Sequence, residues 1–182
     1  MPPVPSRRTP GEGLRALLDL ARDQDEVSAA QALMDRAVAV LVPDEALVLE
    51  RLCTLGRVPL VHIWTRPLTG AAGEPVLENA SRIGRLAGTA LPEVTPAYVA
   101  HLLALGLVCT EPAEGPDGVD TALDDHFHAL LADPLVLRAL ARATGDGSTP
   151  RVLRRALTLT PLGARLVQEA LAGQVESSTD EP

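Results

Sequence analysis

The segment from Thr95 to Val108 joins a short helical pattern directly to a strand-like one. Thr95 is a candidate N-cap, and Pro96 suits the first position of a helix. An apolar stripe follows at the spacing i, i+4, i+7, formed by Tyr98, Leu102 and Leu105. Gly106 can supply a left-handed stop before the β-like residues Leu107–Thr110. A helix that breaks sharply into a strand, with a helix before it and a strand after it, is the centre of a winged-helix domain.

The residues before this unit predict tails and two extra helices. Residues 1–12 are Pro-rich and residues 174–182 are polar, so we predict disordered tails at both places. Residues 13–42 predict two helices, the second with a heptad seam formed by Val27, Ala30, Met34, Ala37 and Leu41. This short seam either packs within the chain, which is the more common use of two heptads, or forms a homodimer through residues 27–41.

Residues 43–173 predict the winged-helix-like domain itself. A helix is expected from Pro43 to Gly56, with Asp44 and Glu45 complementing the dipole of its first turn, although Val42 is a poor cap. The β-branched run 58–64 predicts an edge strand. A further helix is predicted to begin at Pro75, with an inward face formed by Val76, Ala80, Ile83 and Leu86.

The returning half of the domain contains an insertion. Asp120 and Asp133 are expected to cap two helices of an insert at about residues 119–144, and residues 145–150 predict a loop. Residues 151–160 alternate as a strand that begins at Arg151 or only at Arg155, and Thr160 caps the last helix. The predicted fold is mainly α (α+β): a winged helix with a small antiparallel sheet, two extra N-terminal helices and a helical insertion in the wing.

Charge decides how the arginines are interpreted. The net charge of -8 over 182 residues disfavours nucleic-acid binding, which needs a basic face, without excluding a local one. Candidate contacts to phosphates or to a partner are Arg82, Arg85, Arg151, Arg154 and Arg155. Carboxylates gather near them in the sequence at Glu111, Glu114, Asp117, Asp120, Asp124, Asp125 and Asp133. These either repel DNA or fold onto the basic strand through arginine–carboxylate pairs, and we expect the second.

No group of residues predicts catalysis, a metal site or a cofactor site. On one helix His126 and His128 point about 200° apart, and Asp124 with His128 supplies too few metal ligands, so a solvated acidic face is the better interpretation. His62 and His101 stand without a neighbouring nucleophile or carboxylate in the sequence. We therefore predict that the protein is not an enzyme.

The cysteines and hydropathy suggest a location. Cys53 and Cys109 lie in apolar segments without metal-ligand spacing, which predicts buried thiols in a reducing compartment. The N-terminal residues lack the apolar core of a secretory signal, and no run approaches the ~20 apolar residues of a membrane span. A soluble, cytoplasmic protein is expected.

Several motifs together resemble the Abi-alpha family. They are Pro43-Asp-Glu-Ala-Leu-Val-Leu49, Pro96-Ala-Tyr98 with the leucines up to Val108, the acidic insert, and Leu157-Thr-Leu-Thr-Pro-Leu-Gly163, over residues 40–172. The resemblance implies abortive infection, a phage-defence response, and no catalytic residues. It favours an interaction module with a protein partner. The alternative is a winged-helix transcriptional regulator that binds DNA, which a continuous arginine face from Arg82 to Arg155 would favour.

Overall fold

The computed structural model describes residues 9–67, 73–113, 121–144 and 148–177, and the chain divides into two compact units, Met1–Val40 and Leu41–Pro182. The first unit holds helices α1 (Pro10–Asp23) and α2 (Glu26–Val38). The elements of the second are helices α3 (Pro43–Leu55), α4 (Ile83–Ala87), α5 (Thr95–Ala104), α6 (Thr121–Leu131), α7 (Pro134–Ala143) and α8 (Pro161–Ser177), the 3-10 turn η1 (Pro92–Val94), and strands β1 (Val58–Pro67), β2 (Pro75–Ala80), β3 (Val108–Pro112) and β4 (Ser148–Leu159). The prediction of a mainly α chain with a small antiparallel sheet is confirmed.

In the first unit, side chains fix where each helix begins. The hydroxyl of Thr9 accepts the N–H of Glu12 at 3.3 Å, and the Glu12 carboxylate accepts the N–H of Thr9 at 2.8 Å, which is a capping box. Asp25 caps α2 by accepting the N–H of Ser28 at 2.7 Å. Helix α1 thus begins at Pro10, inside the segment that the sequence assigned to a tail, and α8 likewise runs to Ser177.

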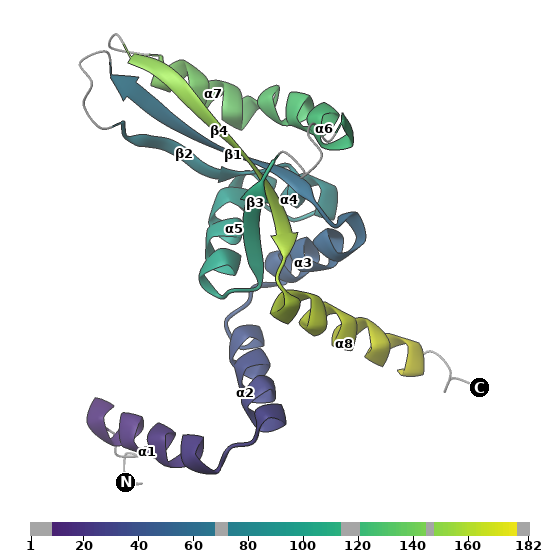
Figure 1. The fold of residues 1–182 in the computed structure, drawn as a ribbon. Coiled ribbons are helices and arrows are strands. Elements are labelled where there is room, and N and C mark those ends of the chain that lie inside the picture. Colours follow the sequence, from purple (N-terminus) through teal and green to yellow (C-terminus); the bar gives the residue numbers. More distant parts are fainter. Residues whose placement is uncertain (1–8, 68–72, 114–120, 145–147, 178–182) are drawn as a thin grey trace, which may run out of the picture. The chain divides into compact units, whose positions relative to one another are not determined.

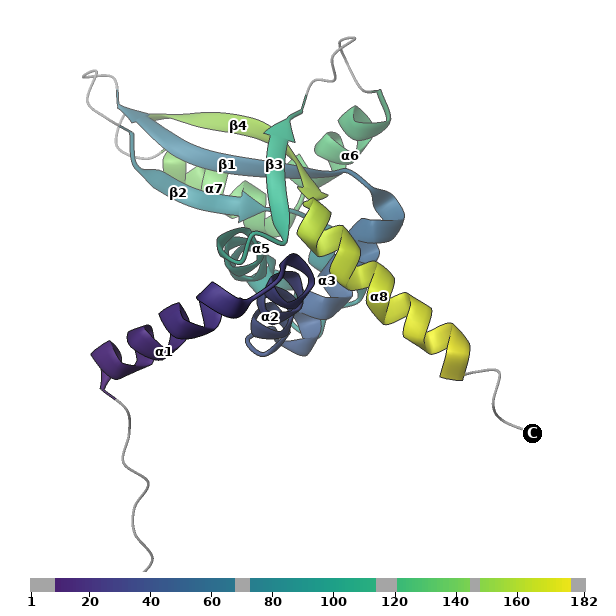
Figure 2. The ribbon, with the colours of Figure 1, turned by 60° about the horizontal axis from the view of Figure 1, so that its bottom comes forward.

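The sheet is built on the pairing of β1 with β4. The strand order is β2-β1-β4-β3, and all neighbours are antiparallel. The β1–β4 register runs without a shift from Val58 opposite Leu157 to Pro67 opposite Ser148, and Figure 2 shows β1 between β2 and β4. Strand β4 therefore starts at Ser148, before either predicted start, because β1 is long enough to pair with residues that the sequence suggested were a loop.

Residues 75–80 are a strand, which corrects the helix predicted from Pro75. They pair with β1, with Val61 opposite Ala80 and Trp64 opposite Pro75, and only Ile83–Ala87 are helical. Asn79 has a φ of 57°, which a helix does not admit, and the Ser81 hydroxyl accepts the N–H of Ile83 just before α4. The open edge of β1 offers hydrogen bonds that override a helical spacing of apolar residues.

Apolar residues are buried on both faces of the central strands. Helices α6 and α7 cover one face and form a core with the strands; its members are Val61, Ile63, Ala80, Leu123, Phe127, Leu130, Val136, Ala139, Ala143 and Ala156. Figure 1 shows these two helices along β1, β2 and β4, while α3, α4 and α5 gather below. Val58, Leu60 and Leu157 are also fully buried, on the alternate positions of β1 and β4.

The helix α5 forms where the sequence places it, with its start and buried face shifted. The turn η1 precedes it, so Val94 is the N-cap and the Thr95 hydroxyl donates to the Pro92 carbonyl at 2.6 Å instead of capping. Its buried residues are Thr95, Val99 and Leu102. Tyr98 and Leu105, which the predicted stripe placed inward, are half-buried. Gly106 has a φ of 69°, which confirms the predicted left-handed stop.

The last helix docks on this corner of the chain. Thr160 donates its N–H to the Leu107 carbonyl at 3.0 Å and its hydroxyl to the Gly106 carbonyl at 2.7 Å. The hydroxyl also accepts the N–H of Gly163 at 3.1 Å, as expected for a cap. A Cβ at Gly163 would collide with the Leu107 carbonyl, so the close approach needs glycine.

We predict that Gly163→Ala destabilises the protein by roughly 1–3 kcal/mol, because the added methyl group meets backbone atoms that cannot rotate away. The measurement is urea unfolding followed by circular dichroism. Gly13→Ala is the matched control, since a Cβ there has no heavy atom within 4 Å and alanine favours the helix. Equal stability of Gly163→Ala and the wild type would contradict the close packing.

Candidate functional site

The five arginines singled out by the sequence do not share one face. Arg82 precedes α4 and Arg85 lies within it, whereas the other three lie on β4. Arg154 pairs across the ladder with Val61, whose side chain packs under α6 and α7. Arg151 and Arg155 stand opposite Trp64 and Leu60, on the other face of the sheet. The continuous arginine face that would favour DNA binding is therefore not formed by these residues.

The acidic insert folds onto part of this basic group. Arg154 contacts Asp124 of α6 at 3.2 Å between Nη1 and Oδ1, and its guanidinium lies 5.3 Å from the centre of the Phe127 ring. Arg85 contacts Asp133 at 3.2 Å, while Asp133 also caps α7 by accepting the N–H of Leu135. The expected pairing of the insert with the basic strand is confirmed for Arg154, whereas Arg85 pairs with the insert from α4, outside that strand. Glu114, Asp117 and Asp120 lie outside the described residues.

Asp44 connects α3 to the start of α5. Its carboxylate accepts the N–H groups of Ala90 and Leu91 at 3.1 and 3.2 Å and the hydroxyl of Tyr98 at 2.8 Å. The N–H of Ala90, followed by the Tyr98 hydroxyl, lowers the pKa of Asp44 below its ordinary value. The same hydrogen bond raises the pKa of Tyr98. A residue expected only to complement a helix dipole thus holds three groups in place.

Glu45 is a buried carboxylate paired with a histidine. It is 2% exposed, accepts the N–H of Val42 at 3.0 Å, and lies 2.7 Å from Nδ1 of His101. The first contact is the Glu45 half of a capping box, while the Val42 side chain offers no acceptor to the first turn of α3. The second corrects the interpretation of His101 as isolated. Tyr98 and His101 are three residues apart and therefore lie on one face of their helix. Asp44 and Glu45 are adjacent carboxylates, and the match between these two pairs is the sequence signal that could have suggested the contacts.

The other candidate residues are dispersed. His126, His128 and Asp125 are exposed on α6, as predicted for a solvated face. His62 accepts the N–H of Asn79, and burial lowers the pKa of His62. Within the described part of the chain no three His, Cys, Asp or Glu residues are grouped to hold a metal ion. None of the described helices is long and apolar enough to cross a membrane.

The cysteines differ from the prediction of two buried thiols. Both thiols are free, but Cys53 is exposed on α3, because α3 buries Val48, Leu49 and Leu52 and turns Cys53 outward. Cys109 on β3 is half-buried, and burial is the main cause of its raised pKa.

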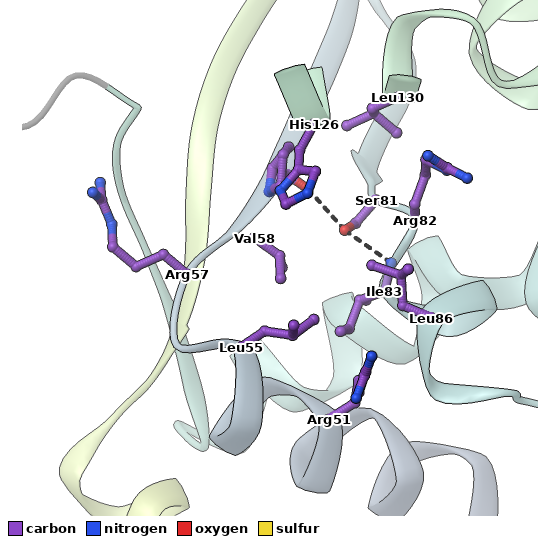
Figure 3. A pocket seen from close by; sticks show the side chains of 11 residues that line it. Arg51, Leu55, Arg57, Val58, Ser81, Arg82, Ile83, Leu86, His126 and Leu130 are labelled. Carbon is purple, nitrogen blue, oxygen red and sulfur yellow. Dashed lines mark hydrogen bonds between the residues drawn. The ribbon is translucent and has the colours of Figure 1, made fainter. Parts of the chain in front are cut away.

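A pocket of about 320 Å³ lies beside the insert. Its walls come from the end of α3, the start of β1, the turn before α4 and the helix α6 (Figure 3). Three of its lining residues are Arg51, Arg57 and Arg82, and it brings together elements that are distant in the sequence. Arg82 is the one of these three arginines that the sequence had singled out, and His126, which the sequence offered as a metal ligand, also lines the pocket.

Comparisons with known proteins identify what the chain resembles. The family model described as abortive infection alpha matches residues 11–170. A solved structure of an uncharacterized protein from the hydrocarbon-degrading marine bacterium Alcanivorax borkumensis SK2 is similar, with a TM-score of 0.59 and 25% identity, over 81% of this chain and 99% of that one. No curated protein matches the chain.

We predict a coupling of about 0.5 kcal/mol between Arg154 and Asp124, because both side chains are partly solvated and the pair is screened. A double-mutant cycle with Arg154→Ala and Asp124→Ala, read by urea unfolding, measures it. The control cycle pairs Arg154→Ala with Asp125→Ala, the exposed neighbour, and should give no coupling. The same coupling in both cycles would mean that the ion pair does not hold the insert.

We predict that the stability contributed by Asp44 depends on pH. Since the folded-state pKa of Asp44 is lowered, its contribution to stability is fully present above the unfolded pKa, near 4, and is lost as the pH falls through the folded value. Asp44→Ala should therefore be less stable than the wild type at neutral pH, and the difference should narrow below about pH 4. Urea unfolding across pH values measures this, with Glu50→Ala on the same helix as control. A difference that stays constant with pH would exclude an ionised Asp44 as the connector.

Proposed function

Because the chain belongs to the abortive infection alpha family, we propose that it acts in abortive infection as a non-enzymatic module that binds a protein partner. The observation that carries this proposal is the engagement of Arg85 and Arg154 by carboxylates of the insert. These arginines are already paired within the chain, so they offer less to a phosphate backbone than the sequence alone suggests.

The order of elements supports a winged-helix scaffold for this module. Helix α3, strand β1, helices α4 and α5, and strands β3 and β4 follow one another, and the three strands lie side by side in the order β1-β4-β3. Strand β2 extends this sheet, and α6 with α7 is inserted between β3 and β4, where a winged helix has its wing.

In such a scaffold α5 would be the helix that enters a DNA groove, and its chemistry does not suit that use. Its exposed residues are Ala97, Ala100 and Ala104. His101 is held by Glu45, and the helix carries no Arg, Asn or Gln for a base edge. This composition supports a scaffold that binds a protein partner and does not recognise DNA bases.

Helix α1 offers a surface suited to a protein partner. Leu14, Leu17 and Leu18 form one stripe on this helix and are 59%, 64% and 52% exposed. The rest of this helix mixes acids and bases: Glu12, Asp19 and Asp23 lie opposite the stripe, and Arg15 and Arg22 lie along its side. A helix that binds anionic lipid carries an excess of basic residues, so this mixed face favours an apolar helical surface of another protein. Val27, the first residue of the heptad seam, is 73% exposed, and dimerisation through residues 27–41 stays a prediction.

The grouping of polar side chains supports a non-enzymatic role. The Glu45–His101 pair resembles the base and orienting acid of a catalytic triad, but a nucleophile is needed as well. The hydrogen bonds of Glu45 and Asp44 instead run to Val42, His101, Tyr98 and backbone groups, which joins two helices. This is the arrangement of a structural connector.

The test is a phage challenge of bacteria that express the chain. We expect the wild type to reduce plaque formation, and Leu17→Asp with Leu18→Asp to restore it toward the empty-vector value, because the charges interrupt the apolar stripe of α1. Leu137→Asp on α7 is the matched control, since Leu137 is 51% exposed, close to the 52% of Leu18, and lies outside the stripe. Circular dichroism and immunoblotting establish that each variant is folded and present. Absence of protection by the wild type would contradict a role in abortive infection. Protection by the α1 variant would contradict the proposal that the leucine stripe of α1 binds the partner.

The DNA-binding alternative is tested on the purified protein with mixed genomic duplex fragments at low and moderate salt. We expect no retardation at either salt concentration. Tight binding that falls steeply with salt, and that Arg154→Glu with Arg155→Glu abolishes, would replace our proposal with a transcriptional regulator.

A further inference from the structure

The pocket beside the insert gathers positive charge in an acidic protein. Four arginines of the described chain are half-buried, namely Arg51, Arg57, Arg82 and Arg155, and the first three line this pocket. The described residues that line it include no carboxylate. Glu50 lines a neighbouring hollow, which Arg51 and Leu86 also line. With a net charge of -8 over the chain, such a local excess of guanidinium groups is a specific feature of this place.

The Nε atom of Arg51 has no hydrogen-bond partner among the described residues. This atom is buried, and in the part of the chain that the structure describes no carboxylate forms an ion pair with Arg51. Figure 3 shows its side chain rising from α3 toward Ile83 and Leu86. A buried N–H of a charged group without an acceptor costs free energy, so an anion that draws the guanidinium into the pocket is bound favourably.

The remaining polar residues of the pocket have different roles. Arg57 is engaged by Glu111 at 3.6 Å and by the Pro112 carbonyl at 3.1 Å, and Figure 3 shows it turned away from the centre. The Ser81 hydroxyl donates to the Pro59 carbonyl and accepts the N–H of Ile83. Arg82 and His126 line other parts of the wall and add charge or a hydrogen-bond donor to the pocket, and Figure 3 shows the Arg82 side chain turned away from Arg51.

The walls between these groups are apolar. Leu55, Val58, Ile83, Leu86 and Leu130 line the pocket, and Val58 and Ile83 are fully buried. The volume of about 320 Å³ lies at the small end of the range for small-molecule sites. A ligand that fills this space has an anionic end near Arg51 and an apolar body against the leucines.

We propose that this pocket binds a small organic phosphate, with the phosphate held by Arg51, assisted by Arg82, and the apolar portion packed against Leu55, Ile83 and Leu86. Guanidinium groups match phosphate oxygens through paired N–H donors, and a dianion uses two cations better than a single negative charge does. The binding site lies in the second unit and is independent of the proposed stripe on α1.

The test is titration calorimetry of the purified protein with phenyl phosphate, inorganic phosphate, benzoate and phenol. We expect phenyl phosphate to bind at least tenfold more tightly than any of the other three, because it alone carries both the dianion and the apolar ring. Arg51→Gln should weaken phenyl phosphate binding at least tenfold, and Arg82→Gln should weaken it less. Arg138→Gln, at an exposed arginine of α7 outside the pocket, should leave it unchanged.

A second variant separates the two halves of the site. Leu86→Asn should weaken phenyl phosphate and leave the weak binding of inorganic phosphate unchanged, while thermal unfolding checks that each variant is folded. Equal binding by the wild type and folded Arg51→Gln would overturn the proposal. Benzoate binding as tight as phenyl phosphate would overturn the choice of phosphate, and absence of any binding would overturn the site.

Discussion

The pairing of β1 with β4 is the interaction on which the second unit depends. It runs from Val58 opposite Leu157 to Pro67 opposite Ser148, and it is flanked by β2 on one side and β3 on the other. Because alternate residues of the two strands point to opposite faces, Val61 and Ala156 pack under the insert while Leu60 and Leu157 are buried on the other side. One ladder thereby fixes where the insert helices and their acidic residues lie.

Local chemistry made much of this fold predictable. Three local effects could be read from the sequence. Proline geometry starts a helix at Pro43, the side-chain cap of Asp133 starts another, and the positive φ of Gly106 ends α5. The predictions that were wrong concern segments whose structure depends on residues far away in the sequence. Residues 75–80 have a helical spacing of apolar side chains, yet the open edge of β1 makes them a strand. The stripe of α5 is shifted because η1 changes where that helix begins.

Some features of the candidate site could be predicted from the sequence, and others depend on the fold. Opposite charge predicted that the insert would meet the basic strand, and Asp124 with Arg154 is that contact. Strand alternation already places Arg154 and Arg155 on opposite faces of the sheet, but sequence could not predict which of these faces α6 and α7 would cover. Nor could it group Arg51, Arg82 and His126, which come from three elements that only the completed fold brings together.

The late position of β4 also affects how the chain emerges from the ribosome. Strand β1 and its hairpin partner β2 are complete by Ala80, whereas the strand that fills the other edge of β1 ends at Leu159. A nascent chain of intermediate length therefore carries an unpaired strand edge with Val61 and Ile63 uncovered, a template for association with other chains. The delay until β4 arrives makes translation speed and chaperone access part of the physics of this fold.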